Sequence, residues 1–178
     1  MPQGRDGFQP ADIHHLRAAQ GWLELGLPSE AARELLRLSP ETTESPLVLD
    51  VRWSVAHAQG DWTEAHRLAC RCVELHPAHA PGWINRSYAA RRMPGGGLPM
   101  ALRLLLPALA LFPGDSLVPY NLACYACQLH DPERAMQWFA IAEERDAISS
   151  SPPGNFRQRA LQDEDLAPIH DWIRSRPA

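Results

Sequence analysis

Four alanines stand at nearly constant intervals along the chain, and this spacing constrains the fold more than any other feature of the sequence. Ala31, Ala65, Ala101 and Ala135 are separated by 34, 36 and 34 residues. Each follows a turn and a helix-start signal, and apolar or small residues stand four and seven positions further on, which is one face of a helix. A small residue at one place in every unit lets two helices approach closely. The spacing therefore predicts repeated helical hairpins, against the alternative of an ordinary helical bundle in which it arose by chance.

The repeat resembles the tetratricopeptide repeat, a unit of about 34 residues whose two helices carry aromatic, small and apolar residues at set places and end at a proline. Trp83 stands at the position of the leading tryptophan, and Pro77 and Pro113 each close a unit twelve residues after its alanine. Trp53 departs from the pattern, because it occupies a close-approach position. The other units carry a small residue there: Ala19, Ser87 and Ala123. The resemblance covers about three-quarters of the chain and is closest over residues 46–147.

This resemblance implies an all-α fold: a right-handed α-solenoid, or superhelix, of about four helix hairpins followed by a C-terminal capping helix. The predicted organisation is a disordered N-terminus at 1–9, a repeat array at 10–147, a linker at 148–155 and a capping segment at 156–178. The array divides into units at about 10–43, 44–78, 79–114 and 115–147. Capping and proline signals predict helices at about 10–25, 28–38, 46–59, 62–75, 80–92, 98–111, 116–129 and 132–146.

Proline is unusually frequent, with 17 prolines against 11 glycines, and most of them fall at predicted helix starts or ends. Pro107 is the exception, because it lies inside a predicted helix, where it should free a carbonyl near Arg103 and bend the helix. Beyond the linker, the segment from Asp163 to Arg174 carries an apolar stripe: Leu166, Ile169, Trp172 and Ile173. We interpret this stripe as a helix that seals the last repeat, and a partner-binding tail is the alternative.

Composition limits the class of protein. The chain has 178 residues, 45% hydrophobic and 21% charged, with a formal net charge of −4. These values favour a globular domain over a disordered chain, and they do not indicate a positively charged surface for nucleic acid. The longest apolar run, 104–112, is too short to span a membrane, and no secretory signal is visible. We therefore expect a cytoplasmic protein whose four cysteines are reduced.

Motifs for catalysis or metal binding are weak. The candidate metal ligands are Cys70, Cys72, Cys124, Cys127, His76 and His79. Cys124 and Cys127 share one helix face, but a zinc site needs two further ligands. Cys70 and Cys72 point apart on their helix, although a histidine of the following turn could join one of them. No serine-hydrolase, zinc-protease or phosphate-loop motif is present, so we expect no enzyme activity, no metal and no cofactor.

In the tetratricopeptide family the first helices of successive units line a concave groove, and the resemblance implies such a partner-binding surface here. One stretch of it carries Leu47, Val51, Ser54 and Ala58, and the candidate binding residues are Asn85, Tyr88, Arg91, Arg92, Tyr120, Asn121, Cys124 and Gln128. Asn85 and Asn121 fall at equivalent places in adjacent units, and an amide can pair with both the N–H and the C=O of an extended peptide. The alternative is that each asparagine bonds locally or to solvent.

The tyrosines and arginines of this surface favour an acidic or C-terminal carboxylate partner. We therefore predict a non-catalytic protein–protein interaction module that binds a peptide or helix of a partner protein in the groove. It is expected to be a monomer or weak homodimer that contacts neither nucleic acid nor membrane. The alternative is a structural subunit or secretion-type chaperone that assembles through its outer face or its termini.

Overall fold

A computed structural model describes residues 8–149 and 156–176, and within these ranges the chain consists of α-helices, short 3₁₀ helices and turns, with no strand. The all-α prediction is therefore confirmed. The chain separates into two compact units, residues 1–95 and 96–178. The boundary lies between Gly95 and Gly96, inside the predicted third hairpin, where three glycines follow Pro94.

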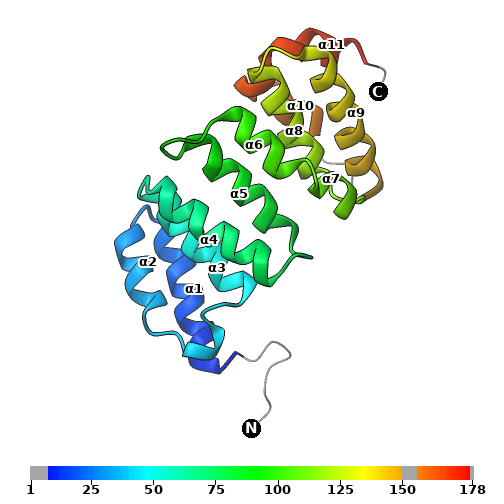
Figure 1. Cartoon of the computed structure of the whole chain (residues 1–178). Helices are drawn as coiled ribbons and strands as arrows, with labels where there is room; N and C mark the ends of the chain where they lie inside the picture. The colour runs from blue at the N-terminus through cyan, green and yellow to red at the C-terminus, as the bar shows by residue number, and fades with distance from the viewer. Residues whose placement is uncertain (1–7, 150–155, 177–178) are drawn as a thin grey trace. The chain divides into compact units, whose positions relative to one another are not determined.

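The first unit contains two helix hairpins and one further helix (Figure 1). Its elements are α1 (Pro10–Glu24), α2 (Pro28–Leu35), the 3₁₀ helix η1 (Pro40–Thr42), α3 (Pro46–Ala58), α4 (Trp62–Leu75) and α5 (Ala80–Arg92). Within the unit α1 packs on α2, α3 packs on α4, and α5 packs on both α4 and α3. Helices α1, α3 and α5 are the first helices of the first three predicted repeats.

The second unit contains the remaining predicted repeat helices and the C-terminal segment (Figure 1). Its elements are α6 (Leu98–Leu105), α7 (Ala108–Leu111), α8 (Leu117–Gln128), α9 (Pro132–Ser149), α10 (Phe156–Ala160), the 3₁₀ helix η2 (Glu164–Ile169) and α11 (His170–Ser175). Helix α8 packs on α9, and η2 packs on both of them.

Burial of the repeated small residues agrees with the predicted hairpins. The marker residues Ala31, Ala65, Ala101 and Ala135 are each 0% exposed. The close-approach residues Ala19, Ser87 and Ala123 are likewise 0% exposed. Each predicted array helix also begins within one residue of its observed start, because the signals that start a helix are local. The Ser45 hydroxyl accepts a hydrogen bond from the Val48 N–H at 3.3 Å, and an Asp61 carboxylate oxygen accepts one from the Glu64 N–H at 2.9 Å.

The turn inside a hairpin needs one residue with a left-handed backbone conformation. Different residue types adopt this conformation at equivalent positions of two units. Gly60 adopts a φ of 72° between α3 and α4, a conformation that glycine reaches without strain. His130, which precedes Asp131 as Gly60 precedes Asp61, adopts a φ of 61° between α8 and α9. The shared turn geometry supports the equivalence of these two units although their residues differ.

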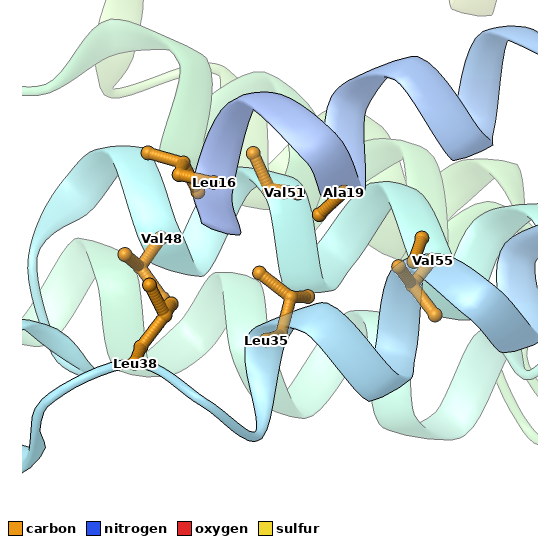
Figure 2. Packing of buried hydrophobic residues seen from close by; sticks show 8 residues of the cluster. Leu16, Ala19, Leu35, Leu38, Val48, Val51 and Val55 are labelled. Atoms are coloured by element: carbon orange, nitrogen blue, oxygen red, sulfur yellow. The ribbon is translucent and has the colours of Figure 1, made fainter. Parts of the chain in front are cut away.

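Helices α1, α2 and α3 enclose an apolar core in the first unit (Figure 2). Its buried members are Leu16, Ala19, Ala31, Leu35, Leu38, Val48, Val51 and Val55. Phe8 packs against this core, and Gln9 caps α1 through reciprocal hydrogen bonds with Asp12. The predicted disordered N-terminus at 1–9 therefore extends too far at residues 8 and 9, and residues 1–7 lie outside the described part of the chain.

Pro107 divides the predicted helix 98–111 into two. Helix α6 ends at Leu105 and α7 begins at Ala108, with a turn between them. Proline has no N–H to donate, and its ring clashes with the preceding helical turn. Leu106 and Pro107 nevertheless keep helical backbone angles, so the predicted helix is interrupted here without leaving the helical conformation.

The C-terminal segment packs on the last hairpin, as predicted, but with different local structure. Leu166, Ile169 and Ile173 are buried and Trp172 is half-buried. The segment from Asp163 to Arg174 is not one α-helix: residues 164–169 form η2 and α11 follows. Pro168 lies inside η2 and removes a helical donor there. The predicted linker overlaps the end of α9 at residues 148 and 149, and its residues 150–155 lie outside the described chain.

Candidate partner-binding surface

A surface pocket of about 580 Å³ lies between the first helices α1 and α3 of the first unit. It is lined by Gln20, Leu23, Glu24, Leu47, Asp50, Val51 and Ser54. The lining includes Leu47, Val51 and Ser54 of the predicted groove face. A volume of this size accommodates one or two side chains of a bound segment, and the mixture of apolar, amide, hydroxyl and carboxylate groups suits a peptide.

Asp50 connects this pocket to α5. One carboxylate oxygen lies 2.6 Å from His79 Nε2, and the other accepts a hydrogen bond from Asn85 Nδ2 at 3.3 Å. Asn85, the predicted peptide-binding amide, therefore already uses one donor within the protein. An amide has a second N–H and an acceptor oxygen, so the side chain is oriented by Asp50 without exhausting its hydrogen-bonding capacity.

An aromatic cluster lies on the same unit, at the end of α3, the start of α4 and the end of α5. We define it as Trp53, His57, Trp62 and Tyr88. The Trp53 and His57 rings stack at 5.2 Å, and Tyr88 meets both of them edge-on at 6.0 and 5.8 Å. Three of these rings were not among the predicted binding residues. The i, i+4 spacing of Trp53 and His57 could have indicated their stacking, but their meeting with α4 and α5 depends on tertiary packing.

Arg92 extends over this cluster. Its guanidinium lies 3.7 Å from the centre of the Tyr88 ring and 5.3 Å from that of Trp62, and it also donates to the Tyr88 carbonyl oxygen at 3.3 Å. Such cation–π contacts fix the position of the guanidinium without neutralising its charge. The structure thus brings Tyr88 and Arg92 together as one aromatic and basic feature, with the half-buried Arg91 beside them in sequence.

The C-terminal segment covers predicted binding residues of the second unit. The Tyr120 hydroxyl donates to an Asp163 carboxylate oxygen at 2.8 Å, and the Gln128 amide donates to the main-chain carbonyl of Asp165 at 3.2 Å. Burial, followed by the carboxylate of Asp163, raises the pKa of Tyr120, so this phenol remains a neutral donor. These side chains of α8 therefore hold a segment of their own chain.

The remaining two predicted residues lie on the same helix. Cys124 is buried, with its sulfur 3.8 Å from an Asp163 carboxylate oxygen. The Asn121 amide donates to the Leu117 carbonyl of its own helix at 2.8 Å, which is the local bonding considered as the alternative for the asparagines.

The cysteines have the properties of packed thiols. Cys70, Cys72, Cys124 and Cys127 form no disulfide. Burial, followed by the nearby carboxylate of Asp50, raises the pKa of Cys72 to about 11, and burial followed by Asp165 and Asp163 raises that of Cys127 to about 11. A thiol with so high a pKa is protonated at neutral pH and is a poor nucleophile.

The paired helices, the buried alanine repeat and the surface along the first helices define a tetratricopeptide-like helical repeat protein. The chain matches no protein-family model and no curated protein. It is similar to solved structures of MamA, a tetratricopeptide-like protein. "Crystal structure of MamA" aligns with a TM-score of 0.64 and 16% identity over 80% of this chain and 83% of that chain.

Two further MamA structures give the same result. "MamA MSR-1 C2" aligns with a TM-score of 0.60 and 20% identity over 83% of this chain and 82% of that chain. "MamA RS-1 ArsTM double mutant" aligns with a TM-score of 0.62 and 18% identity over 93% of both chains. The predicted tetratricopeptide-like fold is therefore confirmed. Among the described helices, none is both long and apolar enough to cross a membrane.

Proposed function

We propose that the first unit binds an extended segment of a partner protein, without catalysis, along a surface that we call the first-helix face. This face comprises the α1–α3 pocket together with Asn85, Tyr88 and Arg92 of α5. The observation that carries the proposal is the pocket of about 580 Å³ between the first helices, because a tetratricopeptide-like scaffold presents these helices as a shared surface.

The chemistry of the first-helix face suits an extended chain. Leu23, Leu47 and Val51 give the pocket apolar groups for a partner side chain, while Gln20 and Ser54 add polar groups to its lining. Polar groups of this kind can pair with the main chain of a bound segment, and the apolar contacts supply affinity. The pocket thus offers both apolar contacts for a partner side chain and polar groups for the partner main chain.

Arg92 favours a carboxylate in the partner. Its guanidinium is held over Tyr88 and Trp62, so little side-chain freedom is lost when it binds an anion. Arginine can donate two parallel hydrogen bonds to one carboxylate. We therefore expect an acidic side chain or a free C-terminus of the partner at this end of the face.

The second unit provides an intramolecular parallel. Gln128 occupies the place in α8 that Arg92 occupies in α5, 36 residues earlier, and its amide donates to the main-chain carbonyl of Asp165. An acidic segment is therefore bound through a first helix within this same molecule. This supports the proposal that the equivalent position of α5 can hold a segment of another chain.

The test is peptide selection followed by substitution. Peptides selected from a random library on the immobilised protein should bind in solution, and Tyr88→Ala and Arg92→Ala should each weaken binding by at least about tenfold, or about 1.4 kcal/mol. Arg33→Ala on α2, where the arginine side chain is 69% exposed, is the matched control and should leave affinity unchanged. Failure to select any peptide, or equal affinity for all variants, would refute the proposal.

A second candidate function is assembly through the other side of the first unit, as a structural subunit or chaperone. A pocket of about 350 Å³ is lined by residues of α2, α3 and α4, and Leu36 at its edge is 82% exposed. Exposed apolar surface of this kind supports self-association. Leu36→Asp should then convert a concentration-dependent oligomer into a monomer in light scattering, whereas a wild-type protein that is monomeric at all concentrations excludes this candidate.

A further inference from the structure

Three potential metal ligands from three different segments meet in the first unit. Asp50 lies in the middle of α3, Cys72 near the end of α4, and His79 at the N-cap of α5. One ligand atom from each lies within 4.8 Å of the other two. Spacing along the sequence did not reveal this cluster, because Asp50 precedes Cys72 by 22 residues and belongs to a different helix. We propose that these three side chains form a zinc-binding site.

The donor atoms select the metal. The cluster offers one sulfur, one imidazole nitrogen and one carboxylate oxygen, which are the three ligand types that zinc binds in proteins. Magnesium and calcium bind oxygen ligands, and a buried cysteine sulfur does not suit them. The mixed set therefore points to zinc rather than to a hard cation.

The geometry lies close to that of a tetrahedral site. Bonds of about 2.0 Å to nitrogen or oxygen and 2.3 Å to sulfur place neighbouring ligand atoms about 3.3–3.5 Å apart. In the structure His79 Nε2 lies 2.6 Å from an Asp50 carboxylate oxygen, and the cluster extends to 4.8 Å. Zinc would replace the hydrogen bond between His79 and Asp50 and displace the Cys72 thiol proton to solvent, and drawing the ligand atoms to these distances needs movements of roughly 1 Å.

The site has a closed side and an accessible side. Cys72 is 1% exposed, and a Cβ atom added to Gly82 of α5 would lie 3.0 Å from its sulfur, so α5 covers the thiol closely. The side chains of His79 and Asp50 are 27% and 25% exposed. A metal ion can therefore enter beside them. The fourth ligand would be water or the amide oxygen of Asn85, whose side chain already contacts Asp50.

Cobalt substitution tests the proposal directly. The reduced full-length protein is treated with a chelator and then titrated with Co²⁺. At one equivalent it should show a thiolate-to-cobalt charge-transfer band and the strong visible bands of tetrahedral cobalt. Addition of Zn²⁺ should abolish both. Cys72→Ser should remove the charge-transfer band. His79→Ala and Asp50→Asn should weaken cobalt binding by at least about tenfold, because even the loss of a residue that only supports a ligand costs this much.

Two neighbouring residues provide matched controls. Cys70 lies on the same helix as Cys72, and His76 lies in the same turn as His79, but neither belongs to the cluster. Cys70→Ser and His76→Ala should bind cobalt like the wild type, and Zn²⁺ should raise the melting temperature of both but not of His79→Ala. Absence of the charge-transfer band in the wild type, its persistence in Cys72→Ser, or equal zinc stabilisation of His79→Ala would overturn the proposal.

Discussion

At the scale of single residues, Asp12 connects the start of α1 to the turn that follows α2. Its carboxylate accepts hydrogen bonds from the Ser39 N–H at 2.7 Å, the Ser39 hydroxyl at 2.8 Å and the Gln9 N–H at 3.0 Å. Burial by itself raises the pKa of Asp12, but these hydrogen bonds outweigh it and hold the pKa below its usual value. The charged form is therefore favoured in the folded state.

This pKa shift predicts a pH-dependent contribution to stability. Because the folded-state pKa is depressed, the contribution is complete above the unfolded-state pKa of about 3.9 and is lost as the pH falls through the lower, folded-state value. Asp12→Asn should lower the free energy of unfolding by about 1–3 kcal/mol at pH 7, and the difference from wild type should shrink below about pH 4. Urea unfolding across this pH range measures it.

Asp171→Asn is the control for this measurement, because the Asp171 side chain is 100% exposed and its substitution should change stability little at any pH. A difference between wild type and Asp12→Asn that stays constant from pH 7 to pH 2 would contradict the assignment.

The binding residues show how far a sequence can predict a surface. Tyr88 and Arg92 are four residues apart on one helix, and the structure places them in contact. The rest of the cluster around them could not be predicted, because Trp53 and Trp62 come from other helices. For Cys124 the helix face was predicted but its contact was not. The residue that covers it, Asp163, lies 39 residues further along the chain.

At the scale of elements, helix starts could be predicted and helix ends were harder. The start of a helix carries a local signal. The side chains of Ser45 and Asp61, for example, accept hydrogen bonds from N–H groups of the first turn of α3 and α4. Helix α2 ends at Leu35, although 28–38 was predicted. Leu38 still packs in the core (Figure 2), but from the turn after α2. Apolar periodicity alone does not distinguish these two ways of burying a leucine.

The C-terminal segment is an element whose stabilising role can be measured. Ile169 is 2% exposed and ends η2, which packs on α8 and α9. Ile169→Ala should lower the free energy of unfolding by about 2–5 kcal/mol, because it removes buried methyl groups and leaves a cavity. Chemical denaturation measures the change, and Leu111→Ala, at an exposed leucine, should cost less than about 0.5 kcal/mol. Similar small losses for both variants would show that the segment does not seal the second unit.

At the scale of the whole molecule, one repeat runs through both units. The four marker alanines, two in each unit, are fully buried, and the fold matches MamA structures over at least 80% of this chain. It was harder to predict which candidate binding residues would be covered by the protein's own chain. Three candidate residues of the second unit, Tyr120, Cys124 and Gln128, contact its own C-terminal segment. Those of the first unit lie beside a pocket and an aromatic cluster. The first unit is therefore where we place partner binding.

Partner binding by the first unit can be tested by nuclear magnetic resonance of the isotope-labelled protein titrated with a library-selected peptide. We expect chemical-shift changes concentrated on the first-helix face, at Leu23, Asp50, Ser54, Tyr88 and Arg92. Changes confined to the pocket on α2, α3 and α4, around Leu36, or to the second unit would contradict it.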